Sequence, residues 1–148
     1  METGQFAPDF SLYADDGGTF TLSEESSPII LYFYPKDNTP GCTKQAVNFS
    51  STDLPPYRVV GVSKDSVESH RKFKEKHDIS ITLLSDPEGK VCELYGVWQK
   101  KKNYGKEYFG IVRSTFIIDT EKKIIKKWSS VQAAKHIEQI SSWLSKQE

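Results

Sequence analysis

The chain has 148 residues, of which 36% are hydrophobic and 27% are charged, so it can build the core of one domain over residues 1–148 and is neither disordered nor fibrous. Twenty basic residues balance twenty acidic ones, which gives no overall field to draw the chain to nucleic acid or to an anionic membrane. The longest strongly apolar stretch, residues 29–34, is far shorter than the roughly 20 residues of a membrane span. Residues 1–10 lack the pattern of a secretory signal, so a cytoplasmic protein is expected.

The first elements in chain order are a hairpin and a buried strand. Phe10 and Leu12 alternate with polar residues, turn residues follow at 15–18, and the alternation resumes at Phe20. This pattern predicts a small β-hairpin that covers the core as a peripheral lid. Residues 29–34 are a continuous run of β-branched and aromatic side chains, which predicts a central strand buried on both faces.

A helix is expected shortly after this strand. Thr39 is a hydroxyl N-cap candidate, Pro40 suits the first helical position, and the helix is expected to run to about Ser51. Cys42 is then the third residue inside the helix, just past the end of the central strand.

The remaining residues alternate strands and helices. Strands are expected at residues 58–62, 81–84, 110–119 and 123–128, helices at 66–77 and 90–95, and a closing helix with an apolar stripe of Ala133, Ile137, Ile140 and Leu144. The lysine-rich stretch 99–106 is expected to be a solvated loop. The order predicts an α/β fold with a central mixed sheet flanked by helices, because alternating units need right-handed crossovers and the late hairpin adds an antiparallel edge.

The position of Cys42 suggests a reactive thiol. Unpaired amides and the positive end of the helix dipole stabilise an anion in the first turn by about 0.3–2 kcal/mol, which favours the thiolate over the thiol. Thr39 could cap the same turn or orient a small oxygen-bearing substrate, and Pro35 and Pro40 would stiffen the loop. The alternative is that Cys42 is a small packed side chain and Thr39 only a cap, and the residue pattern leaves both readings open.

The segment from Phe33 to Ala46, FYPKDNTPGCTKQA, resembles the active-site segment of Q-type peroxiredoxins, also called bacterioferritin comigratory proteins. It contains the peroxiredoxin pattern of proline, three residues, threonine, two residues and cysteine. Similar segments extend along nearly the whole chain: APDF (7–10), GVSKDS (61–66), LSDPEG (84–89), YGVW (95–98) and RSTFIID (113–119).

The resemblance implies a thioredoxin-like fold with an N-terminal β-hairpin, and thiol peroxidase activity. Cys42 would be the peroxidatic thiolate that attacks the O–O bond and becomes a sulfenic acid, and Pro35, Thr39 and Arg113 match the other catalytic positions. The substrate pocket is expected to include Tyr34, Pro40, Gly41 and Gln45.

The chain departs from the subfamily at Val47, where many members carry a resolving cysteine five residues after the peroxidatic one. Cys92 is the other cysteine, and it does not obviously match the helix in which some relatives place a resolving thiol. We therefore expect a one-cysteine cycle in which an external thiol reduces the sulfenic acid. Two alternatives stay open: a Cys42–Cys92 disulfide with Cys92 resolving, and a non-catalytic thioredoxin-fold interaction or holdase domain.

No metal and no organic cofactor are expected. His70, His77 and His136 have no convincing ligand spacing, and no phosphate-binding glycine loop is present in the sequence. The expected partners are a hydroperoxide and a thiol reductant, either thioredoxin, glutaredoxin or a low-molecular-weight thiol. The protein is expected to act as a monomer, with no nucleic-acid partner.

Overall fold

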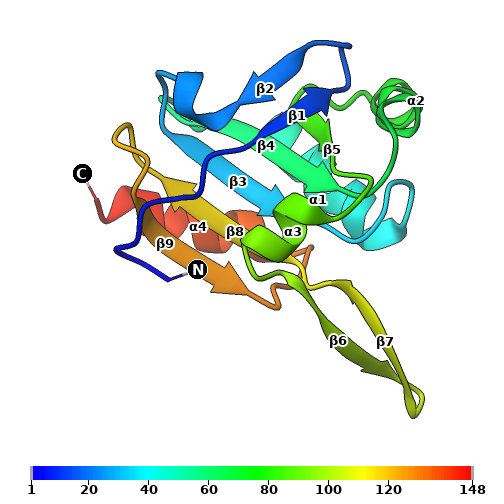
Figure 1. Cartoon of the computed structure of the whole chain (residues 1–148). Helices are drawn as coiled ribbons and strands as arrows, with labels where there is room; N and C mark the ends of the chain where they lie inside the picture. Colours follow the sequence, from blue (N-terminus) through cyan, green and yellow to red (C-terminus); the bar gives the residue numbers. More distant parts are fainter. Residues whose placement is uncertain (1, 148) are drawn as a thin grey trace.

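The computed structural model describes residues 2–147 and contains a seven-stranded mixed sheet with strand order β2-β1-β5-β4-β3-β8-β9 (Figure 1). Its strands are β1 (Ser11–Ala14), β2 (Thr19–Thr21), β3 (Ile29–Phe33), β4 (Arg58–Ser63), β5 (Thr82–Ser85), β8 (Ser114–Ile118) and β9 (Ile124–Ser129). A separate hairpin consists of β6 (Trp98–Asn103) and β7 (Lys106–Ile111). The helices are α1 (Pro40–Ser51), α2 (Val67–His77), α3 (Lys90–Leu94) and α4 (His136–Ser145), with a 3₁₀ turn at Leu22–Glu24. None of the helices within residues 2–147 has the length and apolar composition needed to cross a membrane.

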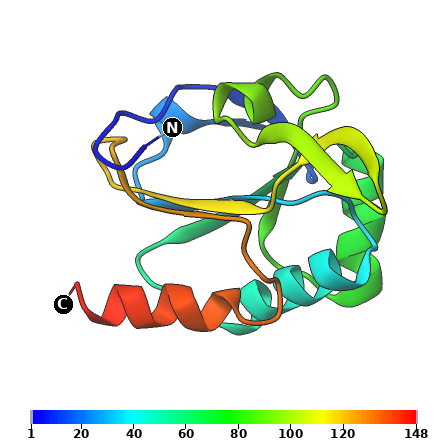
Figure 2. The ribbon, with the colours of Figure 1, turned by 90° about the horizontal axis from the view of Figure 1, so that it is seen from below.

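Strand β3 lies in the interior of the sheet, parallel to β4 on one side and antiparallel to β8 on the other. All five of its residues are buried, which confirms the predicted central strand. Because successive side chains of a strand point to opposite faces, Ile29, Leu31 and Phe33 join one core while Ile30 and Tyr32 join another. In Figure 2, α1 and α4 lie on one side of the sheet and α3 lies on the other.

The N-terminal hairpin forms as predicted, but it is not a lid. Strand β1 pairs with β2 and also, antiparallel, with β5. The hairpin therefore extends the edge of the main sheet, because the free backbone groups of β5 offered a partner that a local pattern could not reveal.

The predicted loop at 99–106 is wrong, because these residues belong to the β6–β7 hairpin. Six residue pairs, from Trp98↔Ile111 to Asn103↔Lys106, are in register. Tyr104 and Gly105 both have positive φ, as two-residue hairpin turns with the favoured twist require. The strands bury no face, so they lack the alternating apolar pattern from which strands are recognised.

The predicted strand at 110–119 is interrupted. Strand β7 ends at Ile111 and β8 begins at Ser114, so Val112 and Arg113 form a short connection between two sheets. Arg113 thus lies just before the buried strand and not within it.

The closing helix begins later than predicted, so Ala133 precedes it. Ile140 is fully buried, and Ile137 and Leu144 pack partly buried against the same core. The first residue of the helix, His136, is also buried, and its ring nitrogens face Thr115 Oγ1 at 2.7 Å and Gln139 Oε1 at 3.0 Å.

We expect His136 to make the stability of the fold sensitive to mild acid. Burial lowers its pKa below the ordinary value of 6.5, and the Arg113 charge lowers it further, although the bond to Gln139 opposes them. The unfolded chain therefore binds a proton at His136 more readily than the folded protein does. The contribution of His136 to the stability of the fold is complete above about pH 6.5, and it declines as the pH falls toward the lower pKa that His136 has in the folded protein. In urea unfolding, the difference in stability between wild type and His136→Gln should shrink between about pH 7.5 and pH 5. A pH-independent difference would contradict this expectation.

Candidate active site

Cys42 is the third residue of α1, as the sequence predicted, and the helix follows the carboxyl end of β3. Thr39 has extended backbone geometry, and its carbonyl accepts the Thr43 N–H at 2.9 Å, which begins the helix. The Cys42 side chain is only 1% exposed. The first-turn amides and the helix dipole therefore act on a sulfur that is largely shielded from water, where they favour an anion most strongly.

The side chain of Arg113 contacts Cys42 directly. Its Nη2 donates to Cys42 Sγ at 3.1 Å, and its Nη1 donates to Gln45 Oε1, one helical turn beyond Cys42. A Cβ at Gly41 would lie 3.3 Å from Arg113 Nη2, so the glycine leaves room for this approach. The guanidinium thus brings a positive charge into direct contact with the sulfur and holds the side chain in one orientation.

Two buried polar atoms near this pair have no hydrogen-bond partner within residues 2–147: Gln45 Nε2 and the Tyr32 hydroxyl. Burial raises the pKa of Tyr32 well above its ordinary value, and the Cys42 charge raises it further, so the phenol stays protonated and can donate. The sequence analysis missed Tyr32, because it stands in an apolar strand run that contains no local sign of chemistry. Donors without a protein partner, close to a thiol, are suited to donating hydrogen bonds to a substrate oxygen.

Thr39 occupies the N-cap position, but its side chain does not cap the helix. The hydroxyl instead donates to the Lys36 carbonyl oxygen at 2.9 Å. The capping prediction is therefore wrong. Because the hydroxyl hydrogen is directed at Lys36, the oxygen keeps its lone pairs free to accept a hydrogen bond from a substrate.

A buried network anchors the loop that leads to α1. Asp37 is 4% exposed and His70 is fully buried. Asp37 accepts hydrogen bonds from the Tyr34 hydroxyl at 2.6 Å and from the Ser69 hydroxyl at 2.8 Å, and its Oδ2 lies 2.7 Å from His70 Nδ1. His70 Nε2 lies 2.8 Å from the Leu84 carbonyl oxygen. Both ring nitrogens of His70 therefore lie within hydrogen-bond distance of oxygen atoms, which fixes the ring between Asp37 and the backbone of β5.

This network changes the expected roles of two residues. The Tyr34 hydroxyl is committed to Asp37, so Tyr34 supports the loop and does not offer its hydroxyl to a substrate. His70 was expected only to lack a metal partner, whereas it shares a buried helix face with Phe73, three residues later. That spacing is the signal that could have placed His70 in the core.

Asp37, Asp65 and His70 are also the described side chains that come close enough together to share a cation. Their acceptor atoms are already engaged: Asp65 Oδ2 accepts the Asp37 N–H at 2.9 Å and the Ser63 hydroxyl at 2.6 Å. These mutual hydrogen bonds account for the cluster as a network that holds the active-site loop.

Cys92 lies far from this arrangement in the fold. It is fully buried in the core on the α3 face of the sheet, whereas Cys42 belongs to the core on the α1 face. Its N–H donates to Asp86 Oδ2 at 2.9 Å. Burial raises the pKa of the Cys92 thiol strongly, and the Asp86 carboxylate raises it further, so this sulfur stays protonated.

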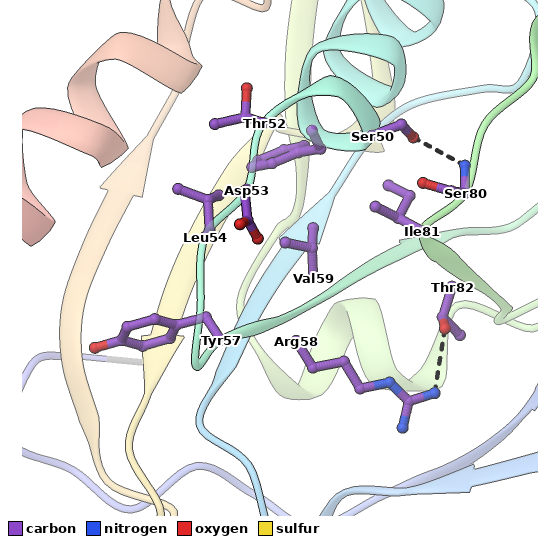
Figure 3. Close-up of a pocket in the computed structure, with 11 residues that line it drawn as sticks. Ser50, Thr52, Asp53, Leu54, Tyr57, Arg58, Val59, Ser80, Ile81 and Thr82 are labelled. Atoms are coloured by element: carbon purple, nitrogen blue, oxygen red, sulfur yellow. Dashed lines mark hydrogen bonds between the residues drawn. The ribbon is translucent and has the colours of Figure 1, made fainter.

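A cavity of about 270 Å³ lies at the other end of α1, beneath Ser50 and Thr52 (Figure 3). Its lining includes Leu54, Tyr57 and Ile81, and the Ser80 N–H donates to Ser50 Oγ at 3.0 Å across it. The lining contains none of the predicted catalytic residues. This cavity is therefore separate from the cluster of Cys42, Gln45 and Arg113 at the N-terminal end of α1.

Comparisons with known proteins agree with this geometry. Residues 3–127 match the AhpC/TSA family. The chain is 50% identical over 143 residues to peroxiredoxin Bcp of Bacillus subtilis, covering 93% of this chain and 90% of that protein. It is 38% identical over 149 residues to peroxiredoxin Bcp of Escherichia coli K12, covering 97% and 96%.

Solved structures give the same result. A cysteine-to-serine mutant of Xylella fastidiosa PrxQ matches with a TM-score of 0.91 at 32% identity, covering 99% of this chain and 97% of that one. The bacterioferritin comigratory protein of Xanthomonas campestris, studied for its alkyl peroxide reduction activity, matches with a TM-score of 0.84 at 33% identity, covering 93% and 91%. These likenesses confirm the thioredoxin-like fold. The chain therefore belongs to the AhpC/TSA family, and it is a peroxiredoxin of the Bcp/PrxQ kind, an enzyme that reduces peroxides with electrons from a thiol.

Proposed function

We propose that this peroxiredoxin reduces hydrogen peroxide and organic hydroperoxides through Cys42 alone, in a one-cysteine cycle that an external thiol completes. The observation that carries the assignment of the nucleophile is the 3.1 Å contact between Arg113 Nη2 and Cys42 Sγ at the start of α1. A guanidinium and a helix N-terminus beside the same buried sulfur can both stabilise negative charge on it, and the thiolate is the species that attacks peroxides.

In the first step the Cys42 thiolate attacks one peroxide oxygen and the O–O bond breaks. The sulfur gives two electrons and becomes a sulfenic acid, and the departing oxygen takes a proton and leaves as water or an alcohol. Arg113 and Gln45 Nε2 would stabilise negative charge on that oxygen, and the Thr39 oxygen would accept a hydrogen bond from the peroxide O–H. Pro35, Pro40 and Gly41 shape the loop and the helix start around this position.

In the second step an external thiol attacks the sulfenic sulfur, releasing water and forming a mixed disulfide. A second thiol then breaks this disulfide and restores the Cys42 thiol, so two electrons return from two thiols.

The location of Cys92 supports the one-cysteine cycle. A disulfide needs Cα atoms within about 7 Å, and a sulfur on the α3 face must cross the sheet to reach Cys42. Cys92 is also held as a thiol and not as the nucleophilic thiolate. Val47, five residues after Cys42, provides no thiol in α1.

Intact-mass spectrometry tests the cycle directly. Wild type, Cys42→Ser and Cys92→Ser are treated with one equivalent of hydrogen peroxide in the presence of a sulfenic-acid trap. We expect one trap adduct on wild type and on Cys92→Ser, and none on Cys42→Ser. A two-proton mass loss in wild-type monomer that disappears in either mutant would instead make Cys92 the resolving thiol. Absence of any Cys42-dependent oxidation would favour the non-catalytic alternative.

A further inference from the structure

The β6–β7 hairpin, here called the lysine arm (residues 98–111), projects from the body of the molecule (Figure 1). Its two strands form a sheet of their own and pair with no other strand within residues 2–147. An isolated two-stranded hairpin is marginally stable in water at best. The catalytic geometry at Cys42 does not explain why the chain builds such an arm.

The surface of the arm combines exposed aromatic rings with positive charge. Tyr104, Tyr108 and Phe109 are 98%, 45% and 58% exposed. Aromatic side chains that stand in water on a projecting element are typical of contact surfaces, because they bury a large apolar area at little cost in side-chain entropy.

The lysines of the arm are mostly left without acidic partners. The arm carries Lys100, Lys101, Lys102 and Lys106 but a single carboxylate, Glu107, which pairs with Lys100 at 3.1 Å. Lys101 donates to the Ile111 carbonyl oxygen. Lys102 and Lys106 are exposed and meet no carboxylate within the described part of the chain. The arm is therefore a local positive field on a protein whose net charge is zero.

A groove of about 450 Å³ joins the arm to the active-site loop. One wall is Pro35 and Lys36, and the other is formed by arm residues that include Trp98, Tyr108 and Phe109. Lys64 adds a positive charge, with its ammonium 4.3 Å from the centre of the Trp98 ring. Asp65 also lines the groove, and its Oδ2 accepts hydrogen bonds from the Asp37 N–H and the Ser63 hydroxyl. The groove also includes Ile111, two residues before Arg113. A molecule seated in the groove thus touches both segments that hold Cys42 in place.

We propose that the lysine arm and its groove are the docking surface for the electron donor, and that this donor is a protein thiol reductant with an acidic surface around its reactive cysteine. The proposal rests on the one-cysteine cycle, in which only a thiol from another molecule can reduce the sulfenic acid at Cys42. A protein donor is favoured over a small thiol because the aromatic and cationic surface extends over the whole arm, well beyond the groove. A specific interface buries about 800 Å² per partner, which a small thiol cannot cover.

The docked donor would perform the reduction in two balanced steps. Its thiolate attacks the sulfenic sulfur of Cys42, forming a mixed disulfide and releasing water. Its second thiol then attacks the donor sulfur of that disulfide, leaving the donor oxidised and Cys42 reduced.

Stopped-flow reduction of peroxide-oxidised protein tests the proposal with two reductants: a thioredoxin of net negative charge, and dithiothreitol as an uncharged small thiol. The variants are Lys102→Glu/Lys106→Glu, which reverses charge on the arm, and Phe109→Ser, which removes an exposed ring. Lys76→Glu/Lys146→Glu is the matched control, because it changes net charge equally at exposed lysines of α2 and at the end of α4.

We expect the arm charge variant to be reduced by thioredoxin at least about tenfold more slowly, with a weaker salt dependence, and Phe109→Ser also to be slowed. All four proteins should react with dithiothreitol at one rate.

The other outcomes overturn the docking proposal. Wild-type rates in the arm variants would do so, as would equal slowing in the control or equal slowing with dithiothreitol. Wild-type rates combined with lost retention on heparin would assign the lysines to a polyanion instead. If wild type is reduced by dithiothreitol but not by thioredoxin, docking is wrong and the one-cysteine cycle stands. If neither thiol reduces the sulfenic acid, the cycle itself is wrong.

Discussion

Replacing Arg113 with methionine is expected to slow the reaction of Cys42 with hydrogen peroxide by about 10²–10³-fold, the cost of removing one preorganised donor from a developing oxyanion. The guanidinium contacts the attacking sulfur at 3.1 Å and is held by Gln45, so its loss removes both the charge that favours the thiolate and a donor to the leaving oxygen. The measurement is the second-order rate constant for sulfenic acid formation by stopped-flow fluorescence, with circular dichroism to verify the fold.

Two further variants make this result specific. Arg71→Met makes the same change at an exposed arginine of α2 and should react at the wild-type rate. Arg113→Lys keeps the positive charge but lacks the planar guanidinium whose two Nη atoms contact Cys42 and Gln45 together. It should therefore recover only part of the rate that is lost in Arg113→Met. A rate for Arg113→Met within threefold of wild type would show that the contact does not drive the reaction.

Replacing His70 with leucine should lower the free energy of unfolding by about 3 kcal/mol, because it removes one partner of the buried Asp37–His70 pair. We expect the lower end of the usual range, since the Tyr34 and Ser69 hydroxyls still donate to Asp37. The same change frees the loop from Pro35 to Thr39, so peroxide reactivity should fall more than the rate of Cys42 alkylation by iodoacetamide, a reaction that does not need the loop geometry.

Urea unfolding and the two rate constants measure these effects. His77→Leu, at a half-buried position on the same helix, is the matched control. The double variant Asp37→Leu/His70→Leu removes both partners of the buried pair, so it should recover much of the stability lost in His70→Leu without restoring peroxide reactivity. Equal loss of stability in the single and double variants would show that the pair is not coupled.

Much of the fold and the position of Cys42 could be predicted from short segments of the sequence. The run from Ile29 to Tyr34 predicted the buried strand, because a strand covered on both faces has no polar positions. Thr39 and Pro40 marked the start of α1, so the place of Cys42 in its first turn followed from spacing alone. The stretch from Gly110 to Asp119 predicted one continuous strand. The structure has two strands there, because Val112 and Arg113 connect β7 to β8 in a different sheet and carry no local turn signal.

Other features depended on neighbours that are distant along the chain. Residues 99–106 of the lysine arm were predicted as a loop, because the two strands pair with each other and show no buried, alternating apolar face in the sequence. No role for His70 followed from the sequence, because its partner Asp37 lies 33 residues away and meets the Nδ1 atom only in the fold. The buried hydroxyl of Tyr32 could not be recognised from the sequence, because its burial and its lack of a hydrogen-bond partner depend on how α1 packs against β3.

The sequence by itself determined the order of the central elements and the position of Cys42 at a helix N-terminus, because backbone sterics and hydrophobic periodicity act over a few residues. The expected role of Cys42 as the nucleophile came from the resemblance to Q-type peroxiredoxins. Only the tertiary structure decided that Arg113 meets the Cys42 sulfur, that an Asp37–His70 pair lies beneath the loop, and that Cys42 and Cys92 are on opposite faces of the sheet. The physical reason is that charge pairing and burial depend on distances in space, and those are set when the sheet brings remote segments together.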